Sequence, residues 1–564
     1  MLRSHTAGEL TAKDEKKSVT LAGWVHRRRD HGGLIFIDLR DRYGLTQLVV
    51  HPDDKEAFKT ADAARPEWVL RVTGAVRKRP AGTVNKDLAT GEVEIAVSEV
   101  EVLSRAKTPP FEIDQGAPGE EQEEGEHEGE VNEDVRLKYR YLDLRRGSGD
   151  GTEGLGGRVI KRHEVIRAIR EYFDGQGFTE VETPLLTSSS PEGARDFVVP
   201  SRLHPHKFYA LPQAPQLFKQ LLMAGGLDRY YQIARCLRDE DMRGDRQPEF
   251  TQLDVELSFA EQEDVIALNE ELAIKLSKQF AKGKKIVGPD GKAAKAFPRL
   301  PYREVIDRYG TDRPDTRFGM ELVDVTDAVA KSEFKVFTGA EQVKAIVVPG
   351  KADISRGDVD ALVEFAQEQG AAGLAWLKVP KANEFDSPIA KFLGADVQKA
   401  LHKKLKAKPG DLALFVADKP RTVAKVLSAL RHKLGRELGL AKPDEFAFLW
   451  VTDFPMYEQD ADTGKWDFSH NPFSMVADPD KLDGESLDEV GGTQYDLVLN
   501  GEEVAGGAIR NHDPALLRKV FHKVGYTDEH FEKGFGHFLK AFDYGLPPHG
   551  GIAWGLDRFL MLLM

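Results

Sequence analysis

The 564-residue sequence contains a single cysteine, Cys236, which excludes an internal disulfide framework and any zinc site built from several cysteines. It has no run of 18 or more apolar residues, which argues against a membrane-spanning helix. Its first residues, MLRSHTAGELTAKDEKK, lack the basic and then apolar layout of a secretory signal. We therefore expect a cytoplasmic protein, and the length predicts about two to four domains.

The sequence has no excess of basic residues: 79 Lys and Arg are outnumbered by 93 Asp and Glu, so that the net charge is −14. Such a balance usually argues against a nucleic-acid partner. The acidic residues are unevenly distributed, however: residues 112–134 carry eleven Asp or Glu and no Lys or Arg. A protein that binds nucleic acid through one module need not be basic throughout, so this class of partner stays open.

The first hundred residues are rich in branched apolar residues and predict β structure. Val93, Ile95 and Val97 alternate with polar or small neighbours, which is the period of a half-buried strand. Five short strands in about a hundred residues favour a small closed barrel of the oligonucleotide-binding (OB) type. The five expected strands are 19–26, 33–40, 45–51, 68–78 and 92–103.

Beyond the barrel, a Pro-, Gly- and Glu-rich stretch cannot form a packed core and predicts a linker. A helical pattern begins after Gly157, and helix and strand signals then alternate to about residue 260. An α/β unit at 311–425 contains the strand-like VKAIVVPG and DLALFVAD. The last segment returns to apolar strands and ends in a helix after Gly555.

Three segments have compositions suited to ligand binding. RCLRDEDMRGDRQPEFTQLD (235–254) mixes arginines with carboxylates; arginine forks suit phosphate and carboxylate groups, although a solvated loop is the alternative. NGEEVAGGAIR (500–510) places glycines where a backbone can approach a ligand, although a bulged hairpin is equally compatible. GGIAWGLDR (550–558) is typical of a strand-to-helix junction that holds anions. Neither common nucleotide-binding loop, GxxxxGK[ST] or GxGxxG, is present.

Together these segments resemble the three motifs of class II aminoacyl-tRNA synthetases. GFTEVETPLL, with Pro184, resembles the dimer-forming first motif; the 235–254 segment, with Arg238 and Glu240, resembles the second; and GIAWGLDR, with Arg558, resembles the third. SPEGARDF, LPQAPQLFKQLLMAGGLDRYYQIARC and LKYRYLDLRR are similar to the bacterial-type aspartyl-tRNA synthetases. The resemblance covers nearly the whole chain.

The resemblance implies a multidomain α/β protein in which an antiparallel-sheet catalytic domain is interrupted by an inserted α/β domain of the GAD type. The expected division is an anticodon-binding OB barrel at 1–105, a linker and hinge at 106–157, the catalytic domain at 158–310 and 426–564, and the insertion at 311–425. The first motif implies a homodimer.

The implied activity is joining L-aspartate to ATP as aspartyl-adenylate, followed by transfer to the 3′ end of a tRNA. Arg510 and Lys219 match the positions that bind the aspartate side chain, and Glu192 and Asp254 match those that bind its α-ammonium. Arg238 and Arg558 match the catalytic arginines. The remaining implied aspartate contacts are Gln216, Arg238 and His470.

For ATP, the resemblance implies that Phe250 and Arg558 sandwich the adenine, a stacking use of aromatic and guanidinium planes. Asp496 and Glu503 match a pair that holds Mg²⁺, which prefers oxygen ligands together with phosphates. The implied ATP contacts are Arg238, Asp239, Glu240, Gln247, Phe250, Glu503, Gly555, Leu556, Asp557 and Arg558.

On the barrel, Phe36 and Gln47 match positions that stack on and hydrogen-bond to anticodon bases. Arg29 is expected to contact phosphate, and a solvated charged face is its alternative. His31 and Gly82 resemble the version that accepts tRNA(Asn) as well as tRNA(Asp); that both are ordinary turn residues is equally compatible.

Two places depart from the family pattern. The Gly-rich segment 147–157 replaces a usual helix start and predicts flexibility, and the chain stops at LLM, where a truncated chain is the expectation. Two rival functions are a non-catalytic tRNA-binding paralogue and the sister enzyme for asparagine or lysine. The presence of the motif residues argues against the first, and Arg510 argues against the second, because an amide substrate does not need that cation.

Overall fold

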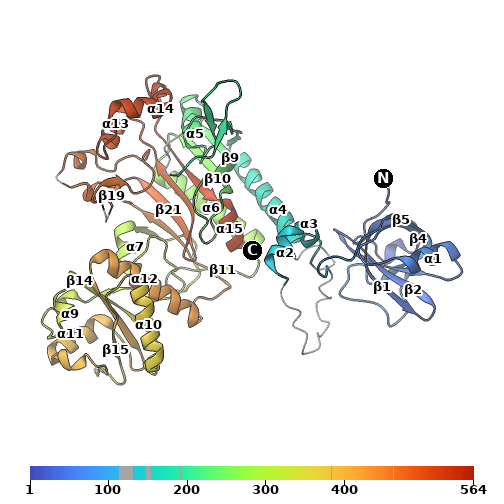
Figure 1. The fold of residues 1–564 in the computed structure, drawn as a ribbon, viewed down its shortest axis with the longest axis horizontal. Helices are drawn as coiled ribbons and strands as arrows, with labels where there is room; N and C mark the ends of the chain where they lie inside the picture. Colours follow the sequence, from blue (N-terminus) through green and yellow to red (C-terminus); the bar gives the residue numbers. More distant parts are fainter. Residues whose placement is uncertain (114–130, 148–153, 190–193, 383, 461–462, 485) are drawn as a thin grey trace. The chain divides into compact units, whose positions relative to one another are not determined.

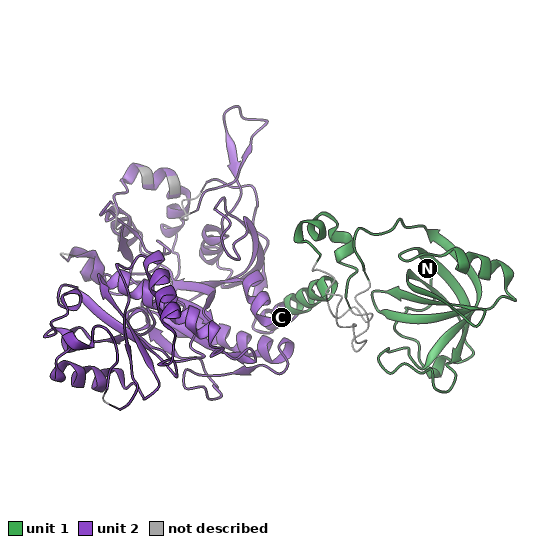
Figure 2. Cartoon of the chain, turned by 60° about the horizontal axis from the view of Figure 1, so that its bottom comes forward, with its two compact units in different colours: residues 1–167 green, residues 168–564 purple. Residues whose placement is uncertain are grey.

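The computed structural model describes residues 1–113, 131–147, 154–189, 194–382, 384–460, 463–484 and 486–564. The chain divides into two compact units, Met1–Arg167 and Ala168–Met564 (Figure 2). Glu192, the acidic stretch 114–130 and residues 148–153 of the Gly-rich segment lie outside the described residues.

The first unit contains a closed barrel of five strands in the order β1-β2-β3-β5-β4, coloured blue in Figure 1. β3 and β5 pair in parallel, and the other neighbours pair antiparallel. The predicted five-stranded OB-type barrel is thereby confirmed. Its strands, with the helix that follows β3, are β1 (Ser18–His31), β2 (Leu34–Asp41), β3 (Gly44–Val50), α1 (Lys55–Ala63), β4 (Val69–Lys78) and β5 (Val93–Ser104).

The alternation of side chains along each strand separates the barrel core from its outer face. On β2, Ile35 and Ile37 are buried in the apolar core, whereas Phe36 between them is only half-buried. Successive side chains of a strand point to opposite faces. Phe36 therefore lies on the outer face, where an aromatic ring can meet a ligand.

After the barrel come α2 (Glu133–Lys138), α3 (Arg140–Asp143) and α4 (Gly154–Gly175). α4 begins inside the Gly-rich segment, four residues before the sequence prediction. Gly154 has φ of +73°, and a Cβ there would lie 2.4 Å from the carbonyl oxygen of Arg146. Glycine at this position therefore lets two chain segments approach closely.

The second unit is built on an eight-stranded sheet in the order β12-β18-β21-β22-β23-β10-β9-β6 (Figure 1). The outermost pairs, β12–β18 and β9–β6, are parallel and the inner pairs are antiparallel. The predicted antiparallel catalytic sheet is thus confirmed. Its strands are β6 (Thr179–Glu180), β9 (Arg229–Leu237), β10 (Glu249–Ser258), β12 (Arg299–Pro301), β18 (Phe448–Thr452), β21 (Gln494–Leu499), β22 (Glu502–Ile509) and β23 (His549–Gly555).

Helix α6 (Gln262–Phe280) is anchored to this sheet by two buried tryptophans. The indole of Trp554 on β23 donates to Asn269 Oδ1 at 2.8 Å, and that of Trp450 on β18 donates to Glu270 Oε2 at 3.0 Å. Burying an indole usually requires such a partner for its N–H. The helix comes from the first half of the interrupted domain and thereby anchors two strands of the second half, β18 and β23.

The inserted segment forms a second, four-stranded antiparallel sheet, β13-β14-β16-β15, with helices on both faces. The predicted boundary at residue 425 falls within α12, whose apolar face packs against this sheet. We therefore propose that the inserted unit extends to Glu437. Its elements are β13 (Val323–Asp324), α8 (Thr326–Val329), α9 (Lys335–Thr338), β14 (Gln342–Val348), α10 (Arg356–Glu368), β15 (Ala375–Lys378), α11 (Ala395–Leu405), β16 (Leu412–Asp418) and α12 (Pro420–Glu437).

The remaining elements border the large sheet. None of the helices within the described ranges is long and apolar enough to cross a membrane. The remaining elements of the second unit are β7 (Val198–Pro200), β8 (Phe208–Ala210), α5 (Gln216–Ala224), β11 (Lys285–Ile286), α7 (Tyr302–Tyr309), β17 (Glu445–Phe446), β19 (Tyr457–Gln459), β20 (Trp466–Phe468), α13 (Pro514–His522), α14 (Asp528–Phe542) and α15 (Leu556–Leu563).

Candidate active site

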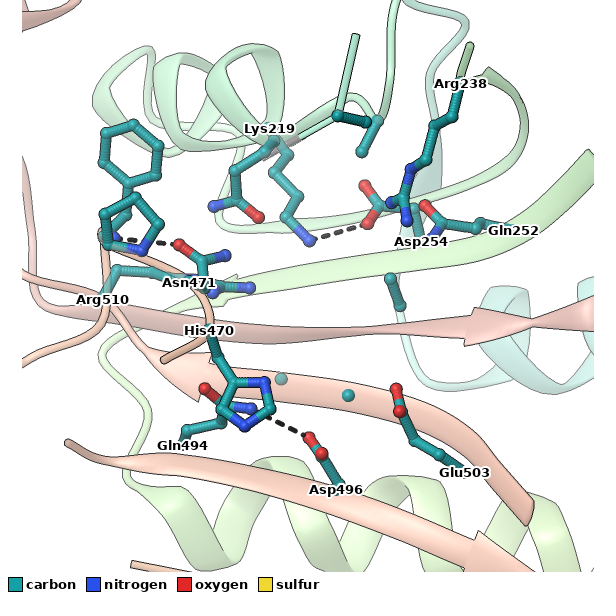
Figure 3. A pocket seen from close by; sticks show the side chains of 18 of the residues that line it. Lys219, Arg238, Gln252, Asp254, His470, Asn471, Gln494, Asp496, Glu503 and Arg510 are labelled. Carbon is teal, nitrogen blue, oxygen red and sulfur yellow. Dashed lines mark hydrogen bonds and ion pairs between the residues drawn. The ribbon is translucent and has the colours of Figure 1, made fainter. Parts of the chain in front are cut away.

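A cavity of about 380 Å³ lies against the large sheet and is lined mainly by polar side chains (Figure 3). Strand β10 shows why the sequence places them there. Gln252 and Asp254 line the cavity, whereas Leu253 and Val255 alternate with them and are fully buried. The period of two along the strand gives it one polar and one apolar face.

Four charged side chains form a buried network at this cavity. Lys219 Nζ on α5 lies 2.7 Å from Asp254 Oδ1 and 3.1 Å from Glu256 Oε2. Arg510 Nε, immediately after β22, lies 3.1 Å from Glu256 Oε1. All four side chains are at most 2% exposed. Two positive and two negative groups balance, which is how a protein can hold charges away from water.

The network shifts the pKa of both acids. Burial raises the pKa of Asp254, and this effect outweighs the attraction of Lys219. Burial also acts to raise the pKa of Glu256, but Arg510 and Lys219 overcome it and hold that pKa below its usual range. Glu256 is therefore firmly charged, whereas Asp254 has less cationic support.

Asp254 also has an unused acceptor. Its Oδ2 is buried and has no hydrogen-bond partner among the residues that the structure describes. A buried carboxylate oxygen in this state is costly and would be satisfied by a ligand ammonium group. Arg510 and Lys219 are the matching cations for a ligand carboxylate. The cavity thus offers both signs of charge to a small zwitterion.

Residues that the sequence analysis missed hold this network in place. Glu256 itself was missed, although it stands two residues after Asp254 and so on the same strand face. The predicted Gln216 donates to Gln220 Oε1 at 2.9 Å, and Gln220 Nε2 lies 3.0 Å from His549 Nε2. Burial lowers the pKa of His549, so a neutral ring packs beside the ion pairs.

His470, Gln494, Asp496 and Glu503 line the opposite wall of the same cavity (Figure 3). The ring of His470 packs edge-on against Phe454, with centroids 4.9 Å apart. Its remaining surface is open to the cavity, yet enough protein surrounds the ring for desolvation to lower its pKa. The structure therefore brings the predicted His470 together with Lys219, Asp254 and Arg510.

A second cavity, of about 330 Å³, adjoins the first and shares Arg238, Glu240 and Glu503 with it. The guanidinium carbon of Arg238 lies 5.1 Å from the ring centroid of Phe250, which is cation–π contact. The other predicted ATP residues that line this cavity are Gln247, Gly555, Asp557 and Arg558.

Two predicted ATP residues do not line either cavity. Asp239 is exposed, and its backbone carbonyl accepts a hydrogen bond from Arg195 Nε at 3.2 Å. Leu556 is fully buried, so that only its backbone could reach a ligand. Neighbouring positions within one segment thus differ in the direction of their side chains.

The segment GGIAWGLDR forms the end of β23 and the start of α15, as its glycines suggested. Asp557 Oδ2 accepts from the backbone N–H of Thr251 at 2.8 Å and so fixes the helix start to β10. NGEEVAGGAIR forms the turn after β21 and strand β22 of one hairpin, and the pairing shifts register opposite Leu497 and Val498 of β21. The hairpin interpretation of this segment is therefore confirmed, whereas its role as a ligand site stays a prediction.

Asp496 and Glu503 are the acids available for a divalent cation. Burial raises the pKa of Asp496 well above its usual range, and the nearby charge of Glu503 raises it further. A cation between the two carboxylates would remove this repulsion. Within the described ranges, no group of three or more His, Cys, Asp or Glu residues is arranged to hold a metal. The pair thus fits a magnesium ion that takes its other ligands from substrate phosphates and water.

On the barrel, the predicted tRNA residues cluster on neighbouring strands. Arg29 pairs with Phe36 in the β1–β2 register, and Arg29 Nη2 donates to Asp38 Oδ2 at 2.8 Å. Gln47 Nε2 donates to the buried Glu94 at 2.9 Å, a residue that the sequence analysis missed. The exposed outer face thus combines one aromatic ring with oriented amide and guanidinium groups.

His31 is the exposed last residue of β1, and Gly82 lies in an exposed turn after β4. Gly82 has φ of +88°, and a Cβ there would meet no atom within 4 Å. The left-handed conformation, rather than lack of space, therefore accounts for glycine at this position. This observation favours the ordinary-turn interpretation of Gly82, while the role of His31 stays a prediction.

Comparison with known proteins identifies the family. Residues 132–564 match the family described as tRNA synthetases class II (D, K and N), and residues 19–103 match the OB-fold nucleic acid binding domain. The chain is 51% identical over its whole length to "Aspartate--tRNA(Asp/Asn) ligase" of Moorella thermoacetica, covering 90% of that protein. It is 50% identical to "Aspartate--tRNA ligase" of Bacillus licheniformis, covering all of this chain and 92% of that protein.

A solved structure supports the fold. The asparaginyl-tRNA synthetase of Pyrococcus horikoshii, complexed with asparaginyl-adenylate, superposes with a TM-score of 0.57 at 18% identity, covering 98% of this chain and 93% of that one. Taken with the family matches and the full-length relatives, the barrel and the polar cavities on an antiparallel sheet lead to one conclusion: this chain is an aminoacyl-tRNA ligase and belongs to the class II tRNA synthetases of the D, K and N family.

Proposed function

We propose that the amino acid activated by this enzyme is L-aspartate, and that the product is aspartyl-tRNA. The observation that carries the proposal is the buried network of Lys219, Asp254, Glu256 and Arg510 beside the cavity. The full-length relatives named aspartate–tRNA ligases support the same substrate.

Selection among aspartate, asparagine and lysine follows from charge. Arg510 and Lys219 offer cations to a substrate side chain, which favours a carboxylate and repels an ammonium group. An amide carries no charge and has one acceptor oxygen instead of two, so it would lose the charge-assisted, two-pronged contact that Arg510 can make with a carboxylate. Asp254 is left to bind the α-ammonium group, so that the α-carboxylate points toward the shared wall at Arg238.

ATP is proposed to occupy the adjoining cavity, with its adenine between Phe250 and Arg558 and its α-phosphate at Arg238. The aspartate α-carboxylate then attacks the α-phosphorus, and the bond to pyrophosphate breaks. Arg238 stabilises the charge that develops on the phosphate oxygens. The 3′-terminal hydroxyl of tRNA next attacks the acyl carbon, and AMP leaves.

Magnesium is proposed to be held by Asp496 and Glu503. When bound, it would neutralise the charge of the ATP phosphates. The two carboxylates lie on adjacent strands of one hairpin, β21 and β22, which gives the pair a rigid base. The proposal predicts that replacing either acid weakens the use of ATP rather than of aspartate.

The tRNA is proposed to bind with its anticodon on the outer face of the barrel, where Phe36 would stack on an unpaired base and Gln47 and Arg29 would bond to neighbouring groups. tRNA(Asp) is the proposed substrate. Charging of tRNA(Asn) is a second candidate, supported by the Moorella thermoacetica relative whose name covers both tRNAs.

A homodimer is proposed around the first motif. β6 lies at the edge of the sheet, and Leu185 and Leu186 just after it are 52% and 55% exposed. Exposed apolar residues beside a free strand edge favour association. Pairing of identical segments about a two-fold axis is the common arrangement.

Amino-acid-dependent ATP–pyrophosphate exchange tests the proposed substrate. Aspartate should support exchange, whereas asparagine and lysine should support it at least about a thousandfold less efficiently, on the order of 4 kcal/mol. Exchange that runs best with asparagine or lysine would overturn the proposal. Absence of exchange with all three would favour a non-catalytic protein instead.

A further inference from the structure

Arg558, the arginine proposed to cover the adenine, is held by hydrogen bonds to Asp245 and to the backbone of Glu503. Its Nε and Nη2 donate to the two carboxylate oxygens of Asp245, at 2.6 and 3.0 Å. Its Nη1 donates to the backbone carbonyl of Glu503 at 2.7 Å. All three nitrogens of the guanidinium group are therefore engaged at its edge, while its flat faces take no part in these bonds.

Asp245 lies in the loop that connects β9 and β10, far from Arg558 in the sequence but at the same cavity. Residues 241–247 of this loop are all exposed. The hydrogen bond from Arg558 lowers the pKa of Asp245, so the pair is charged at neutral pH. A bidentate pair between Arg and a carboxylate fixes the plane of the guanidinium group.

We propose that Asp245 is a positioning residue for ATP: it orients the guanidinium plane of Arg558 for stacking on the purine and ties the β9–β10 loop over the bound nucleotide. The inference rests on the proposed nucleotide cavity. Without the carboxylate, Arg558 keeps only the carbonyl of Glu503, and its plane can rotate about that contact. The guanidinium plane is then no longer oriented for stacking before ATP binds.

The opposite role for Asp245, inhibition of ATP binding, makes an equally clear prediction. If Asp245 instead withheld Arg558 from the phosphates, its removal would strengthen ATP binding. The two roles predict opposite signs for one variant, and the geometry favours positioning, because the bidentate contact occupies the edge of the group and not the face.

The test measures ATP affinity directly by calorimetry, without amino acid, on the full chain. D245N should weaken ATP binding about tenfold, which corresponds to about 1.4 kcal/mol. D241N is the matched control, since Asp241 is in the same loop and its ion pair with Arg243 is highly exposed; its ATP affinity should equal that of the wild type. D245E, which keeps the charge, should recover part of the loss.

A double-mutant cycle shows whether Asp245 affects ATP binding through Arg558. In an R558A background, D245N should change ATP affinity less than twofold, because the group that it positions is gone. In exchange assays of the wild-type background, D245N should raise the KM for ATP and leave the KM for aspartate unchanged. Unchanged or tighter ATP binding by D245N, or an equal loss in the R558A background, would overturn the inference while leaving aspartate activation by the wild type intact. Failure of the proposed function would show instead as a wild type that binds ATP but does not use aspartate.

Discussion

Replacement of Arg510 by leucine should strongly weaken the use of aspartate. Arg510 is 2% exposed, lines the proposed aspartate cavity and does not line the adjoining nucleotide cavity. Leucine cannot donate to a carboxylate, so the substrate side chain would lose a charged partner in a buried site. Glu256 would also lose its ion pair with Arg510 and keep only Lys219, 3.1 Å away.

The size of the loss follows from the burial of the network. Removing one partner of a buried, hydrogen-bonded ion pair costs about 3–5 kcal/mol, and each 1.4 kcal/mol corresponds to about tenfold. Because Lys219 can still face the substrate carboxylate, the lower half of this range applies. We expect a loss of roughly 10²- to 10³-fold in kcat/KM for aspartate.

Pyrophosphate exchange at varied aspartate and at varied ATP measures both effects. The KM for ATP should change less than about threefold, on the order of 0.6 kcal/mol. R510K is the matched control: it keeps the charge but loses the planar fork, so its activity should lie between those of the wild type and the leucine variant. The assignment of this cavity to aspartate would be refuted if R510L and R510K both used aspartate with near wild-type efficiency.

Three further outcomes are expected. E256Q should unfold more easily than the wild type at pH 7 by about 3–5 kcal/mol, because it leaves Arg510 buried without its partner. Because the folded pKa of Glu256 is lowered, this carboxylate stabilises the fold above its unfolded pKa of about 4.3, and the stabilisation disappears as pH falls through the folded pKa. Denaturant titrations in which the stability difference between the wild type and E256Q stays the same at low pH would contradict this. Aspartate substitutions at Leu185 and Leu186 should shift sedimentation from dimer to monomer, and a fully active wild-type monomer at nanomolar concentration would exclude the dimer. Purified tRNA(Asn) should be charged with aspartate within about a thousandfold of tRNA(Asp), about 4 kcal/mol, and a larger gap would identify a discriminating enzyme.

Much of the site could be predicted because its residues stand at fixed positions within three recognisable segments. Arg238, Phe250 and Arg558 meet at one cavity as those segments suggested. Directions within a segment were harder to predict, because burial decides which neighbour faces the ligand. Asp239 points to solvent and Leu556 into the core for this reason.

Contacts between segments could not be predicted from the sequence at all. The bond between Asp245 and Arg558 joins residues that are 313 positions apart, and no local pattern encodes such a pairing. Glu256 is the opposite case, since the period of β10 already placed it beside Asp254. The fold was predicted more fully than the site because alternation and helical periodicity report burial, whereas ion pairs depend on tertiary geometry.

The central claim is that this chain attaches aspartate to tRNA. The most direct measurement is charging of a tRNA(Asp) transcript with ATP, magnesium and an equimolar mixture of aspartate, asparagine and lysine, with the esterified amino acid identified by mass spectrometry. We predict aspartate on the 3′-terminal adenosine and no detectable asparagine or lysine. Binding of the transcript without any charging, or charging with another amino acid, would contradict the claim.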